Sequence, residues 1–246
     1  MEIGRKIIHL DSVDSTNNYT AKLMNQGQID HGTVILADEQ FAGRGQRSSD
    51  WLVKPGENLT FTVFLDRVNV SVNQQFILTQ IVSLSLVDIL KQLDLKAEIK
   101  WPNDIYVEGK KIAGVLIENQ LRSSLIQSSI IGIGLNVNEV GFQDFIATSI
   151  KAEIGAFKNV QEVLYSFIYS FNKTWNEFIK NTDRLNAEYH NNLYLKGVEA
   201  HYEDASGRFF GVIKGVQTTG RLIIQKNEEL MEYDLKEIKF LMQSAL

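Results

Sequence analysis

The stretch that decides the fold runs from residue 99 to residue 117. It reads Ile99-Lys100-Trp101-Pro102-Asn103-Asp104-Ile105-Tyr106-Val107-Glu108-Gly109-Lys110-Lys111-Ile112-Ala113-Gly114-Val115-Leu116-Ile117. Its first residues predict a strand, and Pro102 ends or bends that strand because proline has no N–H to give to a β-ladder. Two apolar runs then flank a turn in which Gly109 can take a positive φ, so a β-hairpin is predicted. Asn103 and Asp104 lie where strand passes into hairpin, so their side chains either point into a cleft or satisfy local turn groups.

The segments before and after this hairpin predict a mixture of helices and strands. Apolar periodicity predicts helices over residues 14–24, 74–93 and 160–179, and strands over residues 33–37, 59–65 and 129–137. After about residue 195, short strands separated by turn residues predict a small β-barrel. They span residues 198–202, 209–216, 221–225 and 230–233. We therefore expect an α/β (α+β) fold with one domain over residues 1–194 and a β-rich domain over residues 195–246.

Composition narrows the class of protein. The 246 residues are 44% hydrophobic and include no cysteine, which excludes thiol catalysis and zinc–thiolate sites and fits a reducing compartment. The net charge of −5 argues against general nucleic-acid binding, because that binding depends on lysine and arginine contacts with phosphate. The first residues lack the pattern of a signal peptide, and no stretch reaches the ~20 apolar residues of a membrane span. We expect a soluble cytoplasmic protein that does not bind membranes.

A second segment combines glycine, arginine and tryptophan. It reads Gln40-Phe41-Ala42-Gly43-Arg44-Gly45-Gln46-Arg47-Ser48-Ser49-Asp50-Trp51. Glycine lets a backbone approach a ligand closely, and arginine offers a planar, permanently charged fork for phosphate. Tryptophan offers a flat face on which a nucleobase can stack. The loop therefore indicates nucleotide binding, although Gly-Arg-Gly also occurs in ordinary turns.

Two further features fit either a functional site or ordinary structural packing. Lys111 lies in the predicted hairpin, where a lysine is more often a solvated surface charge than a functional group. The run Gly132-Ile133-Gly134-Leu135-Asn136-Val137-Asn138 places glycines at alternate positions of an apolar strand. Such glycines mark either close approach of a ligand or a tightly packed central strand.

Five segments, in this order, resemble the catalytic core of the biotin–protein ligases, also called biotin–acetyl-CoA-carboxylase ligases. They are Asp14-Ser15-Thr16-Asn17, Gln40 to Trp51, Lys100-Trp101-Pro102-Asn103-Asp104, Lys111-Ile112-Ala113-Gly114-Val115-Leu116-Ile117-Glu118 and Gly132-Ile133-Gly134-Leu135-Asn136. With the β-rich C-terminus, the resemblance extends over essentially the whole chain. It implies a mixed-sheet catalytic domain flanked by helices and followed by an SH3-like barrel.

The resemblance also implies two reactions in one site. The biotin carboxylate attacks the α-phosphate of ATP, with Mg²⁺ present, to give biotinoyl-5′-AMP and pyrophosphate. The ε-amine of one lysine on a biotin carboxyl carrier protein then attacks this mixed anhydride. The sequence names no clear base for that amine, and it does not indicate which carrier is modified or whether the protein forms a homodimer.

Residue roles follow from the resemblance, position by position. The implied catalytic residues are Lys111, Arg44, Arg47 and Asp104, where Lys111 bridges the carboxylate and the α-phosphate and Asp104 orients Lys111 or helps to hold Mg²⁺. The implied biotin-binding residues are Ser15, Thr16, Gln40, Gly43, Arg44, Lys111, Gly114 and Gly132. The implied ATP-binding residues are Arg44, Arg47, Trp51, Lys111 and Asn136, with Trp51 stacked on adenine.

The loop departs from the family pattern at two positions, which leads to a first prediction. Gln46 stands where a second arginine is usual, and Ser48 replaces the usual glycine. Gln46 carries no charge, and the Cβ of Ser48 disfavours a left-handed backbone. We expect this loop to close less tightly, so that the chain releases biotinoyl-AMP into solution faster than a double variant carrying Gln46→Arg and Ser48→Gly. Equal release rates in a single-turnover experiment would reject this idea.

Three alternatives stay open at this point. A lipoate or octanoate ligase on a related fold is the nearest, and labelled acids would separate it from a biotin ligase. A non-catalytic biotin or nucleotide sensor would keep the pocket without releasing pyrophosphate. Some family members carry an N-terminal helix-turn-helix and repress transcription. Here Asp14-Ser15-Thr16-Asn17 begins close to residue 1, so we expect no operator binding in a gel shift.

Overall fold

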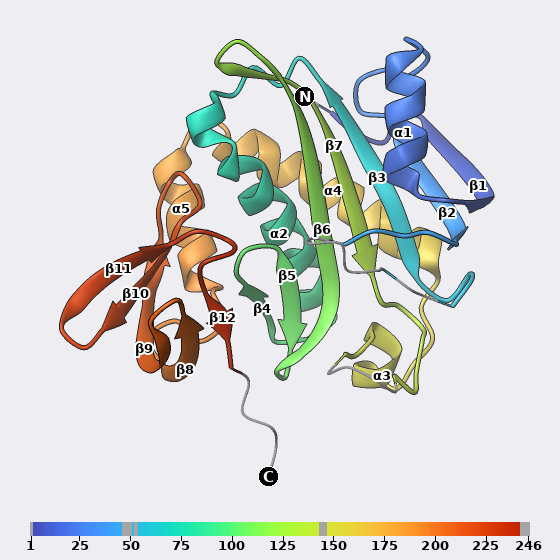
Figure 1. The fold of residues 1–246 in the computed structure, drawn as a ribbon. Coiled ribbons are helices and arrows are strands. Elements are labelled where there is room, and N and C mark those ends of the chain that lie inside the picture. The colour runs from blue at the N-terminus through green and yellow to red at the C-terminus, as the bar shows by residue number, and fades with distance from the viewer. Residues whose placement is uncertain (1, 46–50, 52–53, 143–146, 242–246) are drawn as a thin grey trace.

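The computed structural model describes residues 2–45, 51, 54–142 and 147–241, and its fold consists of two β-sheets with helices packed against the larger one (Figure 1). The larger sheet has seven strands in the order β1-β2-β3-β7-β6-β5-β4. Its strands are β1 (Ile7–Val13), β2 (Val34–Gln40), β3 (Leu59–Asp66), β4 (Ala97–Lys100), β5 (Asp104–Val107), β6 (Lys110–Arg122) and β7 (Leu125–Leu135). Only β1 and β2 run parallel, so the sheet is mixed, as expected.

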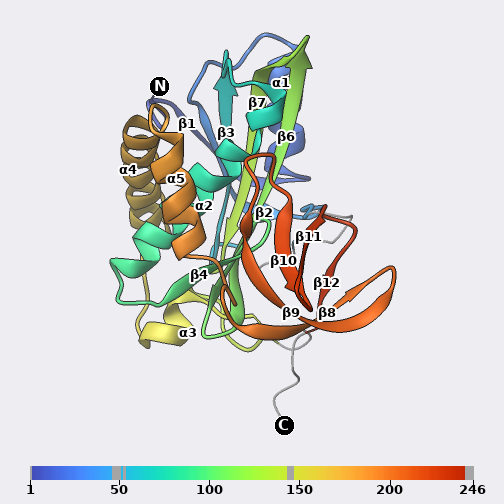
Figure 2. The ribbon, with the colours of Figure 1, turned by 90° about the vertical axis from the view of Figure 1, so that its left-hand side faces the viewer.

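Helices lie on both faces of this sheet. Figure 2 shows α2 (Phe76–Lys91), α4 (Val160–Phe178) and α5 (Thr182–Asn191) on one face and α1 (Thr16–Asn25) on the other. The shorter α3 (Ile150–Ile154) and the 3-10 turn η2 (Val72–Gln74) complete the described helical elements. No helix in the described part of the chain is both long and apolar enough to cross a membrane.

The core lies between the sheet and the α2–α4 layer. Every residue of β3 except Asp66 is buried, including Thr60 and Thr62, which lie between its apolar residues. Phe61 of β3 meets Phe167 of α4 edge-to-face, with ring centroids 5.1 Å apart. Phe171 and Trp175 continue this aromatic row along α4. Burying each such side chain contributes roughly 1.5–3 kcal/mol, so the row fixes α4 to the sheet.

The hairpin predicted from residues 99–117 is confirmed. Glu108 and Gly109 both have positive φ, 48° and 73°, as a tight hairpin turn requires. The preceding strand, β4, ends at Lys100, directly before Trp101 and Pro102, whose shared peptide bond is cis. Strand β6 runs further than expected, to Arg122, because β7 pairs with it along almost its whole length.

The sequence reading missed β1 and α5. Strand β1 lies at the sheet edge and alternates weakly, since only Val13 of its seven residues is buried. Helix α5 is polar and buries only Leu185 and Tyr189. Neither element carries enough apolar periodicity to be read from sequence alone.

The C-terminal strands form a second, antiparallel sheet in the order β11-β10-β9-β8-β12. They are β8 (Glu199–Asp204), β9 (Gly207–Val216), β10 (Leu222–Lys226), β11 (Glu229–Tyr233) and β12 (Lys239–Phe240). This five-stranded antiparallel sheet agrees with the small β-rich domain predicted for the C-terminus, and in the described residues β11 and β12, its two end strands, do not pair with each other. Helix α5 ends at Asn191 and β8 begins at Glu199, and a domain boundary between residues 194 and 195 stays a prediction.

A carboxylate that is 10% exposed, Asp204, holds one end of this second sheet and leads to a stability prediction. Asp204 accepts hydrogen bonds from Lys226 Nζ, Tyr233 Oη and the Ser206 hydroxyl, at 2.6–2.9 Å. Burial opposes ionisation, but these hydrogen bonds outweigh it and lower the pKa of Asp204 from its ordinary value of 3.8. A lowered pKa stabilises the folded state above the unfolded pKa, and this stabilisation is lost as the pH falls through the folded pKa.

Asp204→Asn is therefore expected to lower the free energy of unfolding at pH 7 by about 1–3 kcal/mol, the cost of removing a charged hydrogen-bond partner. The gap between the wild type and this variant should narrow as the pH is lowered below about 4, where the wild-type carboxylate loses its advantage. Urea unfolding at pH 7 and pH 3 measures both effects. A gap that stays constant over this range would show that ionised Asp204 does not stabilise the sheet.

Candidate active site

One cavity of about 320 Å³ opens between the larger sheet, the start of α1 and the C-terminal sheet. It is lined by Ser15, Thr16, Asn17, Gln40, Arg44, Gly45, Trp51, Thr60, Lys100, Trp101, Pro102, Asn103, Asp104, Lys111, Gly114, Val115, Leu116, Gly132, Ile133, Gly134, Leu235, Ile238, Lys239 and Phe240. This size lies at the lower end for small-molecule sites. The cavity thus collects residues from all five segments that the sequence singled out.

A polar network forms the inner end of the cavity. Gln40, the last residue of β2, accepts from the backbone N–H of Thr16 at 2.7 Å and from its hydroxyl at 2.9 Å. The Thr62 hydroxyl of β3 lies 2.8 Å from Thr16 Oγ1 and 2.7 Å from Asn17 Oδ1. Because all four side chains are buried and bonded to one another, this end of the cavity is rigid and polar.

The alternate glycines of β7 leave room for side chains from other elements. A Cβ on Gly132 would overlap the amide of Asn17, and a Cβ on Gly134 would overlap the indole ring of Trp51. Of the two alternatives open from sequence, these contacts support a tightly packed central strand, and close approach of a ligand stays a prediction.

Lys111 and Asp104 form an ion pair at the cavity wall. Lys111 Nζ lies 2.7 Å from Asp104 Oδ1, and each side chain is about a third exposed or less. Strands β5 and β6 bring them together, since Asp104 pairs with Gly114 across the hairpin. A Cβ on Gly114 would lie 3.2 Å from Lys111 Nζ, so the glycine gives the ammonium group its space. Lys111 is therefore a cation positioned by an ion pair and not a solvated surface charge.

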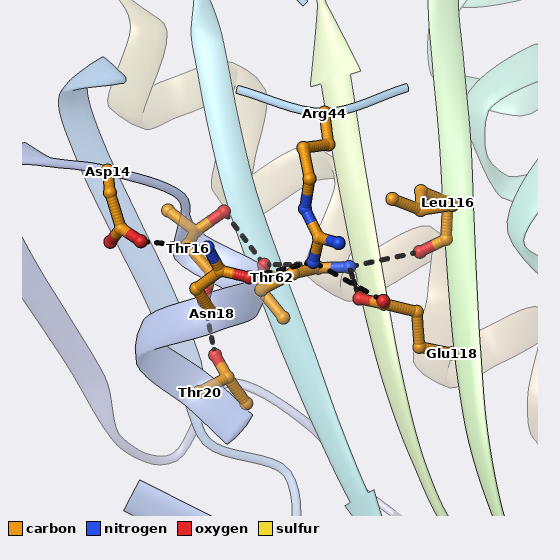
Figure 3. Close-up of polar contacts among 9 residues, drawn as sticks. Asp14, Thr16, Asn18, Thr20, Arg44, Thr62, Leu116 and Glu118 are labelled. Carbon is orange, nitrogen blue, oxygen red and sulfur yellow. Dashed lines mark hydrogen bonds and ion pairs between the residues drawn. The ribbon is translucent and has the colours of Figure 1, made fainter. Parts of the chain in front are cut away.

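Arg44 lies over the same cavity on the side of α1 (Figure 3). Its Nη2 donates to Asn18 Oδ1 at 2.7 Å and lies 3.3 Å from Glu118 Oε1. Asn18 in turn donates to Asp14 at 2.7 Å, and this bond, together with the nearby Arg44 charge, lowers the pKa of Asp14. The guanidinium is therefore positioned by polar partners on α1 and β6.

Trp51 lies inside the cavity. Its backbone N–H donates to Gly43 O at 2.9 Å, which folds the ends of the loop together. The Lys111 ammonium lies 5.7 Å from the centroid of the indole ring. The Nε1 of Trp51 is buried and has no partner in the described part of the protein. A buried donor without a partner is costly, and a ligand that accepts from this N–H would remove that cost.

The C-terminal sheet supplies a wall of the cavity that the sequence did not predict. Lys100 Nζ donates to Tyr106 Oη at 2.9 Å and lies 5.5 Å from the ring centroid of Phe240 on β12. Burial lowers the pKa of Lys100, and nearby Asp104 opposes that shift. Burial also raises the pKa of Tyr106 to about 12, so its hydroxyl stays protonated at neutral pH. Lys239 brings a further cation from β12 to the same wall.

Trp101, Pro102 and Asn103 line the cavity but also hold the fold together. Trp101 Nε1 donates to Gly220 O at 2.9 Å, which fixes the C-terminal sheet against the larger sheet. Tyr189 donates its hydroxyl to Pro102 O at 3.2 Å, and Asn103 donates its side-chain amide to Val115 O. The side chain of Asn103 therefore satisfies a local backbone group, which is the alternative reading that sequence left open.

Most residues that the sequence predicted for the site come together here. Ser15, Thr16, Gln40, Arg44, Trp51, Asp104, Lys111, Gly114 and Gly132 all line the cavity. Gly43 lies beside it, with its missing Cβ facing Gln40 Nε2 at 2.8 Å. Asn136 does not line it, because its amide donates to Thr148 O at 2.9 Å. Arg47, Gln46 and Ser48 lie outside the described residues, so their predicted roles stay predictions.

The sequence reading missed several members of the site. Asn17 and Glu118 belonged to quoted segments but received no role, and Asn18 lies directly after the first of those segments. A single strand or helix does not reveal that these residues meet. Lys100, Lys239 and Phe240 were missed because they come from two different sheets. Within the described residues no group of three or more histidine, aspartate or glutamate side chains gathers as a metal site.

Comparisons with known proteins agree with this geometry. The chain is 28% identical to the bifunctional ligase/repressor BirA of Bacillus subtilis over 234 residues, which cover 92% of this chain and 71% of that protein. It is 35% identical to the biotin–[acetyl-CoA-carboxylase] ligase of Paracoccus denitrificans over 131 residues, about half of each chain. A biotin protein ligase from Aquifex aeolicus, solved in complex with biotin and ATP, superposes with a TM-score of 0.80 at 26% identity and covers 96% of this chain and 98% of that one.

The strongest assignment comes from a family model. It matches residues 10–136, which contain α1, the glycine–arginine loop, the β5–β6 hairpin and the glycines of β7. This chain therefore belongs to the biotin/lipoate A/B protein ligase family.

Proposed function

We infer that the chain is an ATP-dependent ligase that activates biotin as biotinoyl-5′-AMP and transfers it to a lysine of a biotin carboxyl carrier protein. The observation that carries this inference is that Arg44 and Lys111, from separate segments, line one cavity whose inner end is a rigid polar slot. A related protein with this fold is solved with biotin and ATP bound, and the relatives include named biotin–[acetyl-CoA-carboxylase] ligases.

The first reaction brings two anions together. A carboxylate must approach the α-phosphate of ATP, and their repulsion dominates unless positive charge is already in place. We propose that Lys111 contacts both the carboxylate and the phosphate, and that Arg44 and Arg47 contribute further charge. The Asp104 contact at 2.7 Å supports the role of Asp104 as the group that aims the Lys111 ammonium. ATP supplies the activation, so positioning supplies much of the rate and no covalent enzyme nucleophile is required.

The ring of biotin needs an apolar slot with a few polar contacts. We propose that the slot is the end of the cavity where Ser15, Thr16, Gln40 and the backbone at Gly114 and Gly132 meet. Gly43 and Arg44 would then cover the valeryl tail and bring the carboxylate towards Lys111. The burial of Thr16 and Gln40 supports this assignment, because a rigid polar slot loses little entropy on binding.

The adenine ring is assigned to Trp51 and the ribose–phosphate side to the segment that ends at Asn136. The orphaned indole N–H supports a ligand-dependent role for Trp51. Folding of the Gly43–Trp51 loop over the acyl-adenylate would keep the anhydride from water.

Mg²⁺ fits the donor set of this cavity only together with ATP. Mg²⁺ is usually bound by one or two carboxylates plus substrate phosphates, and Asp104 is the carboxylate that lines the cavity. We propose that Asp104 and the phosphates would hold the ion, which would supply charge neutralisation when bound. Lys111 and Arg44 bind and orient the same phosphates from the protein side.

The second reaction requires a neutral amine on the carrier. A free lysine has a pKa of about 10.4, so a proton must leave before attack. Asp104, the released phosphate oxygen and solvent are the candidates for its acceptor, and we do not choose among them. The particular carrier, a homodimer, a cytoplasmic location and the lack of operator binding stay predictions.

One experiment tests the proposed function directly. The chain is incubated with ATP, a biotin carrier domain and either biotin, lipoate or octanoate, and the carrier is analysed by mass spectrometry. We expect one biotinoyl group on a single lysine and no transfer of the other acids. Transfer of lipoate or octanoate instead would favour the related acyl ligases, whereas biotin binding without pyrophosphate release would indicate a sensor.

A further inference from the structure

Glu118, on β6, lies just outside the cavity and contacts two residues that line it (Figure 3). Its Oε2 accepts from Asn17 Nδ2 at 2.7 Å, and its Oε1 lies 3.3 Å from Arg44 Nη2. Neither contact is part of the ligand chemistry described above. The question is which of them gives Glu118 a function.

The contact with Arg44 is weak. The Arg44 and Glu118 side chains are 48% and 41% exposed, and an exposed ion pair of this kind adds little because solvent screens it. The contact with Asn17 is different, since Asn17 is only 3% exposed and its partner is ionised. A short hydrogen bond from a buried amide to a carboxylate is about twice as strong as a neutral one. The effect of Glu118 therefore passes mainly through Asn17.

The carboxylate decides which way the Asn17 amide faces. A side-chain amide has a donor end and an acceptor end, whereas an ionised carboxylate only accepts. The nitrogen of Asn17 must therefore face Glu118, where it also lies 3.5 Å from Leu116 O. The oxygen then faces the Thr62 hydroxyl, which donates to it at 2.7 Å. Without Glu118, the long contact of 3.5 Å to Leu116 O would still favour this orientation but only weakly, and the Thr62 hydroxyl would not oppose a flip because a hydroxyl can either donate or accept.

The orientation of Asn17 matters because its amide lies against the cavity floor. Asn17 lines the cavity beside Gly132, and its Oδ1 occupies the space that a Cβ on that glycine would take. Of the two ends of the Asn17 amide, the oxygen lies nearer to Gly132, so an acceptor is placed on this side of the slot. A cyclic urea such as the ring of biotin carries N–H donors, which an acceptor floor suits and a donor floor repels.

We propose that Glu118 is a positioning residue that fixes the Asn17 amide with its oxygen toward the ligand slot and so contributes to selection of a ring bearing N–H donors. This role rests on the proposed function, since the ring in question is that of biotin. Glu118 itself does not touch the ligand.

The test measures biotin binding by calorimetry without ATP, so that adenylate formation at Arg44 and Lys111 does not affect the result. Glu118→Ala is expected to weaken biotin binding about tenfold, the loss expected when a buried donor loses its acceptor. Glu118→Gln is expected to stay within about threefold of the wild type, because the oxygen of its amide can still accept from Asn17. If the charge next to Arg44 were what matters, Glu118→Gln would bind biotin as weakly as Glu118→Ala, and the proposal would be overturned.

A double-mutant cycle separates this role from general loss of stability. Asn17→Ala alone should weaken biotin binding, and adding Glu118→Ala to it should weaken binding no further. Glu2→Ala is the matched control, because Glu2 also pairs with an arginine, Arg5 at 2.5 Å, and neither of these residues lines the cavity. Additive losses in the cycle would reject the positioning role. If the wild type binds no biotin at all, the proposed function fails and this inference fails with it.

Discussion

Lys111→Ala is expected to slow formation of biotinoyl-AMP by about 10²–10³-fold, the usual cost of removing one preorganised charge from a transition state. The affinity for biotin alone should change by no more than about fivefold, because a cation that is about a third exposed adds little to ground-state binding. A large loss in kcat with a small change in biotin Kd is the pattern of an interaction made mainly in the transition state. Biotin-dependent pyrophosphate exchange and calorimetry measure the two quantities.

The hairpin supplies a matched control for this variant. Lys110 precedes Lys111, is half exposed, does not line the cavity and lies 4.0 Å from Glu153 Oε1. Lys110→Ala removes the same charge from the same turn and should leave adenylate formation within about twofold, because it is a surface ion pair. Equal losses of adenylate formation in the two variants would mean that the net charge of the hairpin matters and that the position of Lys111 does not.

Gly132→Ala is expected to weaken biotin binding by about 100-fold or to lower the free energy of unfolding by about 1–3 kcal/mol, the range for overpacking a tight site. A Cβ at this position would overlap the Asn17 amide. That amide cannot move away cheaply, since it is buried and held by both Glu118 and Thr62. Calorimetric binding of biotin and thermal unfolding measure the two effects together.

A second glycine variant shows whether the position or the extra methyl group matters. At Gly114 a Cβ would meet the flexible end of Lys111 at 3.2 Å and Asp104 Oδ1 at 3.4 Å. Gly114→Ala should therefore disturb adenylate formation more than biotin binding, the reverse of Gly132→Ala. Our account of the contact between Gly132 and Asn17 would be contradicted if Gly132→Ala bound biotin like the wild type and stayed equally stable.

Much of the fold could be predicted from local patterns. The hairpin was readable because Gly109 separates two apolar runs, and the long helix α4 because its aromatic residues recur at helical spacing. Strand β1 and helix α5 could not be read, since one lies at a sheet edge and the other is mostly polar. The strand order of the C-terminal sheet also could not be read, because strand pairing depends on contacts between residues far apart in the chain.

The residues of the candidate site were also only partly predictable from the sequence. Ordered motifs identified Arg44, Asp104 and Lys111 as candidates, and the cavity collects all three. No motif indicated that Phe240 of β12 and Lys100 of β4 share a wall, although they are 140 positions apart in the sequence. Nor did any motif show that the buried side-chain amide of Asn136 donates a hydrogen bond to Thr148 O, a contact within the fold.

The sequence by itself determined the family, the order of the main elements and the chemical types gathered in the site, because these depend on residue identity, spacing and local conformational preference. Only the tertiary structure decided how those groups are aimed: Lys111 at Asp104, Arg44 between Asn18 and Glu118, and the Asn17 amide with its oxygen inward. The physical reason is that a hydrogen bond depends on distance and direction between atoms of different elements, and those are fixed only when the sheet and helices pack together.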